Sequence, residues 1–160
     1  MIKVNIISLG RLKEKYLREA VEEYTKRISG YAKLSVVEIE PERLSDNPSE
    51  SETEAALKAE AEKIMKKIEA GSFTVAMCIE GKQMASEEFA KMFSDKINSG
   101  TGVFNFVIGS SYGLHSSVKN SADIKFSFSK MTFPHQLFKV MLLEQIYRAF
   151  KINEGSKYHK

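Results

Sequence analysis

The most constraining feature of this sequence is a short, almost uninterrupted apolar segment in its second half. Val103–Ile108 carries apolar side chains at every position except Asn105. A strand with one face in water alternates apolar and polar residues, whereas a strand covered by helices on both faces is apolar nearly throughout. The segment therefore predicts a strand inside a largely parallel sheet that has helices on both sides.

The other strands and the helices alternate along the rest of the chain. Short alternating or apolar segments predict four more strands at Ile2–Leu9, Leu34–Ile39, Phe73–Ile79 and Ile124–Phe128. Helical periodicity predicts helices at Lys13–Ile28, Ser51–Ala70, Ser86–Asn98, a short segment from His115, and Pro134–Asn153. We therefore expect one α/β domain over residues 1–160, with five strands in a single layer.

Turn-forming residues predict where these elements begin and end. Pro41–Glu50 contains two prolines and several polar residues, which predicts a loop. Gly71 is expected to end the second helix, and Gly81-Lys82 to turn the chain after the third strand. Ser86 can cap the helix that begins there.

The last helix is more apolar than one buried face requires. Pro134–Asn153 carries apolar residues on more than one side, which is typical of a helix buried on more than one side. The sheet can cover one side, and a second copy of the chain is a natural cover for another. We expect a homodimer, with Leu142 exposed on the isolated subunit; a well-buried helix in a monomer is the alternative.

Composition narrows the class of protein. No apolar run approaches the roughly 20 residues of a membrane span, and the N-terminus lacks a signal peptide's apolar core. The single cysteine, Cys78, lies among apolar residues, which predicts a buried inert thiol and no internal disulfide. The three histidines show no zinc-ligand spacing with it. We expect a cytoplasmic protein without a metal site.

Two loops at the carboxyl ends of strands carry residues that packing alone does not require. Gly109–Leu114 holds two glycines, and strand ends of this kind bind ligands in open α/β sheets. It lacks the lysine of a phosphate-binding loop and the third glycine of a dinucleotide site, and a plain tight turn is the alternative. Phe128–Gln136 contains two phenylalanines and a methionine, which are costly to expose in a loop, so we expect them to line a buried pocket. Pro134 suits the first helical position, with Thr132 or Phe133 at the cap.

The C-terminal end is basic and ends in residues suited to RNA. From Lys125 onward there are seven basic residues against two acidic ones, which could meet a phosphate backbone or simply be solvated. In Gly155–Lys160, an aromatic ring can stack on a base, a lysine can contact phosphate, and a histidine can move a proton. A frayed, solvent-exposed terminus is the alternative.

Five segments resemble one known family. They are Phe106–Gly109, Gly113–His115, Ser127–Leu137, Leu143–Ile152 and Tyr158–Lys160. Together with the rest of the chain they closely resemble the ribosomal RNA large subunit methyltransferase H family. One departure is Ser110, where that family usually has a second glycine.

The resemblance implies a fold, a cofactor and a reaction. The fold is a SPOUT-type α/β fold, a mostly parallel sheet flanked by helices, with a C-terminal trefoil knot. The protein is then a homodimer that uses S-adenosyl-L-methionine to methylate the ring imide nitrogen, N3, of a pseudouridine in large-subunit (23S) ribosomal RNA. Assembled ribosomes are the preferred substrate. The cofactor positions carried over from the family are Met77, Gly109, Phe128, Ser129, Lys130, Met131, Thr132 and Phe133.

The catalytic roles are our own interpretation of the side-chain chemistry. His159 is the candidate base or proton relay for the imide proton. Tyr158 is expected to stack on or hydrogen-bond the pyrimidine, and Arg148 to hold a phosphate. Glu144 and Arg148, four residues apart, could instead form only a structural ion pair.

Two other classes of protein are distinguishable from this one. A non-catalytic ribosome-binding dimer would keep the basic tail but would not need the aromatic loop. Another kind of nucleotide-binding α/β enzyme would need a phosphate-cradling loop, which this sequence does not have.

Overall fold

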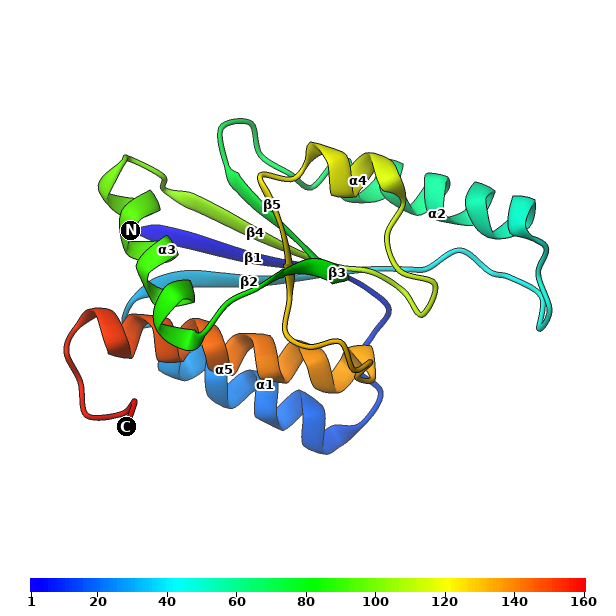
Figure 1. The fold of residues 1–160 in the computed structure, drawn as a ribbon. Coiled ribbons are helices and arrows are strands. Elements are labelled where there is room, and N and C mark those ends of the chain that lie inside the picture. The colour runs from blue at the N-terminus through cyan, green and yellow to red at the C-terminus, as the bar shows by residue number, and fades with distance from the viewer.

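The apolar segment Val103–Ile108 is β4, the central strand of a five-stranded sheet in the computed structural model of residues 1–160 (Figure 1). The strand order is β2-β1-β4-β3-β5, and every pairing is parallel. The other strands are β1 (Ile2–Leu9), β2 (Ala32–Ile39), β3 (Phe73–Gln83) and β5 (Ile124–Ser127). The prediction of an α/β fold with a largely parallel five-stranded layer is confirmed.

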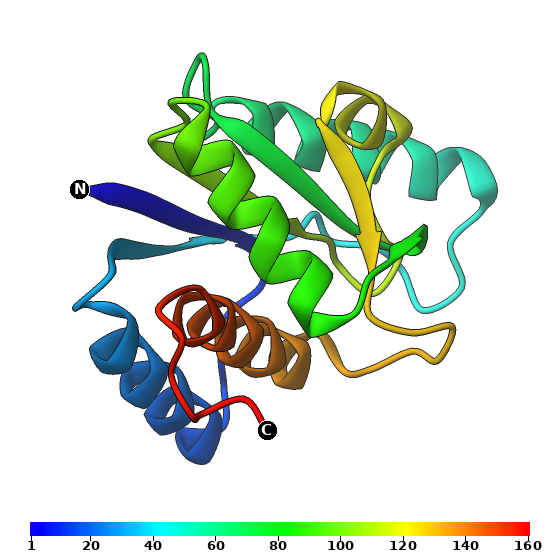
Figure 2. The same ribbon diagram turned by 60° about the vertical axis from the view of Figure 1, so that its left-hand side comes forward.

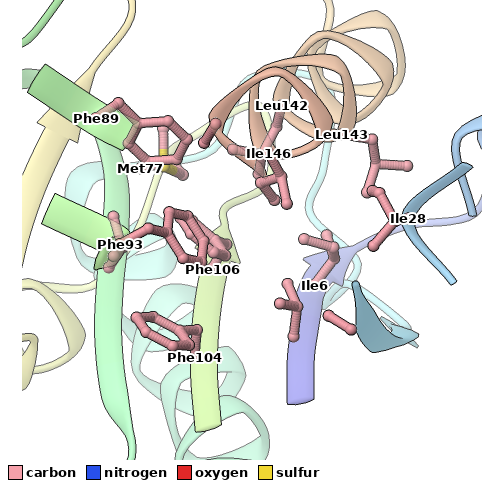
Figure 3. Close-up of a cluster of buried hydrophobic side chains, with 14 of the residues drawn as sticks. Ile6, Ile28, Met77, Phe89, Phe93, Phe104, Phe106, Leu142, Leu143 and Ile146 are labelled. Carbon is pink, nitrogen blue, oxygen red and sulfur yellow. The ribbon is translucent and has the colours of Figure 1, made fainter. Parts of the chain in front are cut away.

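Helices cover both faces of this sheet (Figures 1 and 2). One face is covered by α1 (Lys15–Ile28), α3 (Ser86–Asn98) and α5 (His135–Asn153), and the other by α2 (Glu50–Met65) and α4 (Ser116–Ser121). Alternate residues of β4 point to opposite faces of the sheet. Phe104 and Phe106 face α1, α3 and α5, and Val107 faces α2 and α4. Figure 3 shows the first layer, where Phe89 and Phe93 of α3 pack beside Phe106.

The one polar residue of β4 is hydrogen-bonded on both sides. The Asn105 side chain is fully buried, and its Oδ1 accepts a hydrogen bond of 2.9 Å from Asn5 Nδ2 on β1. Its Nδ2 donates to Ser72 Oγ at 2.7 Å and to Thr74 Oγ1 of β3 at 3.2 Å. A buried amide with all these partners costs little, which explains its place in an otherwise apolar strand.

The expected turn at Gly81-Lys82 is wrong, because both residues belong to β3. The pairing of β3 with β5 shifts register between Met77 and Lys82. A Cβ built on Gly81 would lie 2.6 Å from the backbone of Phe126. The glycine therefore serves the close approach of two strands, a role that sequence patterning does not separate from that of a turn.

Helix ends also differ from expectation. α2 ends at Met65 rather than Ala70, because the chain then turns through backbone bonds such as Lys67 N to Ile64 O. Pro134 lies at the N-cap of α5, one residue before the first helical position, and no side chain caps that helix. Ser86 does not cap α3, where the Glu88 carboxylate instead accepts a hydrogen bond from the Ala85 backbone N–H at 2.7 Å. β3 ends at Gln83, four residues later than the expected Ile79, and the remaining boundaries agree to within two residues.

α5 lies between α1 and α3 and is the most buried helix. Leu142, which the sequence suggested would be exposed on one subunit, is completely buried under the helices of its own chain. Leu137 is 41% exposed and is the open apolar residue of this helix. None of the helices combines the length and apolarity needed to cross a bilayer. The trefoil knot implied by the resemblance stays a prediction.

Candidate functional site

A cavity of about 410 Å³ opens beside the middle of β3 and at the carboxyl ends of β4 and β5, and we call it the loop cavity. Its volume falls within the roughly 300–1,000 Å³ of small-molecule sites. Seven of the eight residues expected to bind a cofactor line it: Met77, Gly109, Phe128, Ser129, Met131, Thr132 and Phe133. Lys130 does not line it. The structure thus brings together residues of β3 and of the two loops after β4 and β5, while their role in binding stays a prediction.

Two glycines shape the turn after β4. A Cβ built on Gly109 would lie 2.4 Å from the carbonyl oxygen of Gly113, so only glycine fits without a shift of the backbone. The Gly113 N–H donates to the Ser110 carbonyl at 2.9 Å, and Gly113 has a φ of +85°, the left-handed region. The backbone at Gly109 therefore packs directly against the backbone at Gly113, with no side chain between them, and the loop cavity lies next to this turn.

The residue that departs from the family pattern contacts a buried carboxyl group. Ser110 Oγ lies 3.4 Å from Oε1 of Glu60, a residue of α2 that is only 4% exposed. The other carboxylate oxygen accepts a hydrogen bond of 2.9 Å from the backbone N–H of Glu42. Burial raises the pKa of Glu60 above the usual carboxyl range. Glu60 thereby joins α2 to two loops, and sequence reasoning missed it because it lies in a helix with a mostly charged, exposed pattern.

The aromatic loop after β5 is braced internally. Ser127 Oγ donates to the Ser129 carbonyl at 2.9 Å, and the Met131 N–H donates to Ser129 Oγ at 3.0 Å. The Phe128 ring packs against Phe138 of α5 at 4.8 Å between ring centroids. Met131, however, is 73% exposed, so the expectation of a buried loop is wrong for this residue.

The pKa values of Cys78 and His135, two further residues of the loop cavity, are shifted by burial. Cys78 is half-buried rather than fully buried as expected. Burial raises the pKa of its thiol, which disfavours the reactive thiolate. His135 at the start of α5 also lines the cavity, and sequence reasoning did not select it. Burial lowers the pKa of His135, and nearby Lys139 lowers it further, which favours the neutral imidazole.

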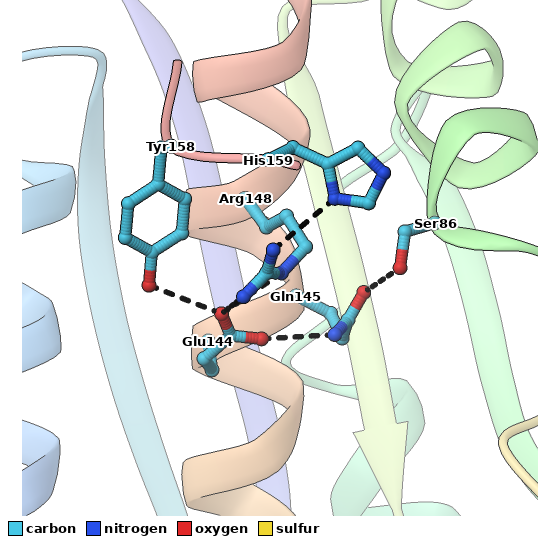
Figure 4. A network of polar contacts seen from close by, with 6 residues as sticks. All are labelled: Ser86, Glu144, Gln145, Arg148, Tyr158 and His159. Carbon is cyan, nitrogen blue, oxygen red and sulfur yellow. Dashed lines mark hydrogen bonds and ion pairs between the residues drawn. The ribbon is translucent and has the colours of Figure 1, made fainter. Parts of the chain in front are cut away.

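The C-terminal tail folds back onto α5 and α3 instead of fraying (Figure 4). Arg148 donates two hydrogen bonds to Oε1 of Glu144, at 3.0 Å from Nε and 2.7 Å from Nη2. Tyr158 donates its hydroxyl to the same oxygen at 3.2 Å. Burial and the nearby Glu144 raise the pKa of Tyr158, which keeps the phenol protonated. The three candidate catalytic residues Arg148, Tyr158 and His159 thus lie in one network.

The network fixes the tautomer of His159. Nη1 of Arg148 lies 3.1 Å from His159 Nδ1, and a guanidinium can only donate, so Nδ1 accepts. Nε2 then carries the proton and donates to Oε1 of Glu87 at 2.7 Å. This hydrogen bond lowers the pKa of Glu87 and keeps its carboxylate ionised. Both ring nitrogens are engaged in this conformation, and Arg148 is paired rather than free for a phosphate.

A second cavity of about 390 Å³, which we call the side cavity, lies between the tail network and the loop cavity. It shares the walls Phe126, Phe128 and Phe133 with the loop cavity. Its polar lining residues, Ser86, Glu144 and Gln145, belong to the tail network (Figure 4). None of Arg148, Tyr158 and His159 lines the loop cavity of the same chain. The structure contains no group of three or more metal-ligating side chains.

Comparisons of the sequence with known proteins identify methyltransferases. Residues 2–159 match the family model described as predicted SPOUT methyltransferase. The chain is 47% identical over 159 residues to the ribosomal RNA large subunit methyltransferase H of Streptococcus suis, covering 99% of this chain and 100% of the relative. It is 49% identical to the protein of the same name from Clostridium beijerinckii, with the same coverage.

Solved structures share the fold at low sequence identity. A probable methyltransferase from Bordetella pertussis superposes with a TM-score of 0.58 at 13% identity, covering 92% of this chain and 94% of that one. A probable methylase family protein from Haemophilus influenzae gives a TM-score of 0.55 at 15% identity, over 100% of this chain and 72% of that one.

Proposed function

The chain belongs to the SPOUT methyltransferase family, among the ribosomal RNA large subunit methyltransferase H proteins, and on that premise we propose its substrate, cofactor and chemistry. It is an enzyme that transfers a methyl group from S-adenosyl-L-methionine to the imide nitrogen N3 of a pseudouridine in 23S ribosomal RNA. The observation that carries the proposal is the loop cavity. Seven residues expected from the family resemblance converge there from β3 and from the loops that follow β4 and β5.

The loop cavity fits the proposed cofactor. Its volume of about 410 Å³ suits a nucleoside-sized ligand, and the Phe128 and Phe133 side chains offer apolar walls to a flat ring. The glycine turn at Gly109 allows a ligand to approach the backbone closely. When bound there, the cofactor supplies the methyl group. Met77, Gly109 and the loop from Phe128 to Phe133 are the residues proposed to hold it.

The acceptor nitrogen must lose a proton for the reaction to proceed. An imide N–H is protonated at neutral pH, and His159 has the side chain best suited to accept its proton. In the folded-back tail Nδ1 of His159 accepts from Arg148, so this contact must open before the nitrogen is free. We place proton removal on Nδ1 after this release, with Glu87 orienting the ring from the opposite side.

The assembly proposed for the active enzyme is a homodimer that acts on assembled ribosomes in the cytoplasm. The partly exposed apolar residues of α5, with Leu137 the most exposed among them, favour a cover by a second subunit. The basic residues toward the C-terminus suit contact with RNA phosphates.

Radiolabelled methyl transfer to ribosomes from a strain that lacks the gene tests the function directly. We expect label in 23S RNA at a pseudouridine, mapped to N3 by mass spectrometry. Calorimetric titration with S-adenosyl-L-methionine and, separately, with ATP distinguishes the alternatives. Binding of neither would favour a non-catalytic ribosome-binding protein, and binding of ATP alone would favour another nucleotide-binding enzyme. Either result, together with no methyl transfer, would refute the proposal.

A further inference from the structure

We propose that a basic cluster at the start of α1 is a docking surface for the RNA substrate, with phosphate groups on Arg11 and Lys13 and an unstacked base on Tyr16. The basic cluster consists of the exposed residues Arg11, Lys13, Lys15 and Arg18. This inference rests on the proposed RNA substrate and adds the surface that binds its backbone outside the loop cavity. It depends on the position of the cluster, on its unpaired charges and on the exposed ring among them.

The basic cluster lies at the same edge of the sheet as the mouth of the loop cavity. It follows β1, which pairs in parallel with β4, so both strands end at that edge. The loop that follows β1 contacts the first turn of α5, where the Lys13 backbone N–H donates to Oε1 of Gln136 at 3.3 Å (Figure 1). A Cβ built on Gly10 would lie 3.8 Å from Nε2 of His135, which lines the loop cavity. A base that approaches a methyl donor in that cavity brings its flanking phosphates to the surface around it, which includes the cluster.

The charges of the cluster favour an anion from outside the chain. Residues 11–18 contain four basic residues and one acidic residue, and α1 has no acidic residue in its first turn. The side chains of Arg11 and Lys13 form no hydrogen bond or ion pair with the chain. Lys15 Nζ lies 3.6 Å from Oε1 of Glu19, and an ion pair exposed to this degree contributes little. A phosphate group would therefore meet two free cationic side chains and no fixed competitor.

The backbone that carries these side chains is held in place. Nη1 of Arg18 donates to the carbonyl oxygen of Lys13 at 2.6 Å and to that of Leu12 at 3.3 Å. Leu12 and Leu17 are buried in the core, whereas every residue between them is exposed. A loop that is ordered before binding loses less conformational entropy when a ligand arrives, which favours binding.

A buried lysine adds positive charge on the side of α5 that faces this loop. Lys139 lies three residues after Gln136 and four after His135, and therefore on the same side of the helix. It is only 3% exposed, and it forms no hydrogen bond or ion pair with the chain. A buried charge without a partner is unfavourable, so an anion bound at the neighbouring loop would stabilise it.

An exposed aromatic ring lies among the charges of the cluster. Tyr16 is 67% exposed, and its hydroxyl forms no hydrogen bond with the chain. An exposed aromatic ring between cationic side chains is typical of surfaces that bind unpaired RNA, because the ring stacks on a base while the cations contact phosphates. A second copy of the chain could also cover the ring, but the positive charges around it favour a polyanion.

The test measures equilibrium binding to ribosomes from a strain that lacks the gene, at several KCl concentrations. The variants are Arg11→Gln/Lys13→Gln and Tyr16→Ala, with Arg11→Lys/Lys13→Arg and Tyr16→Phe as conservative versions. Lys66→Gln/Lys67→Gln is the matched control, because it removes the same charge from exposed side chains without hydrogen bonds or ion pairs, at the end of α2 on the other face of the sheet. Calorimetric titration with S-adenosyl-L-methionine and sedimentation check the cofactor site and the oligomeric state of each variant.

We expect Arg11→Gln/Lys13→Gln to weaken ribosome binding at low salt by about ten- to a hundredfold, as for the loss of hydrogen bonds to charged groups. The slope of log K against log[KCl] should fall by about 0.7–0.9 for each lost phosphate contact. Tyr16→Ala should weaken binding by about five- to 150-fold without changing this slope, because stacking releases no counterions. The control and the conservative variants should bind ribosomes like the wild type, and all variants should bind the cofactor with unchanged affinity.

A salt slope for Arg11→Gln/Lys13→Gln equal to that of the wild type would overturn the inference, because no phosphate contact would have been lost. Weaker cofactor binding with unchanged ribosome binding would also overturn it and would assign the cluster to the carboxylate of the cofactor. A monomeric Tyr16→Ala would overturn the role of the ring and assign it to the subunit interface. Failure of the wild type to transfer a methyl group would refute the proposed function, whereas the salt slopes would still decide this inference, since binding is measured without transfer.

Discussion

Replacing Gly109 by alanine should weaken cofactor binding through a collision that the structure locates to a single carbonyl group. The added Cβ would lie 2.4 Å from the Gly113 oxygen and 2.5 Å from its carbon, well inside van der Waals contact. The obstacle is backbone, so a side-chain rotation cannot relieve it. The turn from Gly109 to Gly113 must shift instead, and forced insertions of this size typically cost about 1–3 kcal/mol.

The cost appears in one of two measurable quantities. If the shift of the turn leaves the loop cavity unchanged, the variant loses about 1–3 kcal/mol of folding stability, and each kcal/mol lowers the melting temperature by about 2–4 °C in a chain of this size. If the shift distorts the loop cavity, a similar energy is lost from binding of S-adenosyl-L-methionine, which is about a fivefold to 150-fold loss of affinity, since about 1.4 kcal/mol is a factor of ten. The turn lies at the surface, so we expect most of the effect in affinity.

The chain provides a matched control in Gly102. A Cβ built there meets no atom within 4 Å, and its φ is not in the left-handed region, so Gly102→Ala should leave both quantities unchanged. The assays are calorimetric titration with the cofactor and thermal denaturation followed by circular dichroism. The reasoning fails if Gly109→Ala matches Gly102→Ala in both affinity and melting temperature.

Three further predictions concern the tail, a buried carboxyl group and the subunit interface. Deleting Lys157–Lys160 should spare cofactor binding, because none of these residues lines the loop cavity, but abolish methyl transfer to ribosomes; full transfer by the truncated protein would exclude a catalytic tail. Because burial raises the pKa of Glu60 in the folded state, folding stability should fall as the pH rises from the ordinary carboxyl pKa of about 4.3 to the raised value. In urea unfolding, Glu60→Gln should lack this fall, and identical pH profiles of the variant and the wild type would contradict the prediction. Leu137→Glu should convert a dimer into a monomer in sedimentation at micromolar concentration, and a monomeric wild type would refute the dimer outright.

Sequence patterning was sufficient for the sheet, and the family resemblance added seven of the residues that line the loop cavity. Val103–Ile108 is apolar because helices cover both faces of β4, so its composition reports its place directly. The two loops that begin at Gly109 and Phe128 were selected because they follow strands, and parallel strands bring their carboxyl ends to one edge, whereas the individual cofactor positions came from the family resemblance.

What the sequence could not provide depends on contacts between distant segments. Gly81 has the local signature of a turn, and only the position of β5 makes it a point of close approach. In the sequence Glu60 is one more charged residue in a charged helix, and only the folded chain brings Ser110 and the Glu42 N–H beside it. His159 contacts Arg148, which is 11 residues away in the sequence, and Glu87, which is 72 residues away. Helical or strand periodicity does not predict contacts at these separations.

The hydrogen bonds of Asn105 have a consequence for the alignment of the site. Asn105 stands opposite Asn5 on β1 and Thr74 on β3, and the same register sets Met77 opposite Ile108. If β4 slid by one residue, Asn105 would turn into the phenylalanine-rich layer, and each polar group left unpaired would cost about 1–3 kcal/mol. The hydrogen bonds of this buried amide therefore fix the register of the central strand against both of its neighbours. The distance between Met77 and Gly109 across the loop cavity is thereby decided some four residues away, inside the sheet.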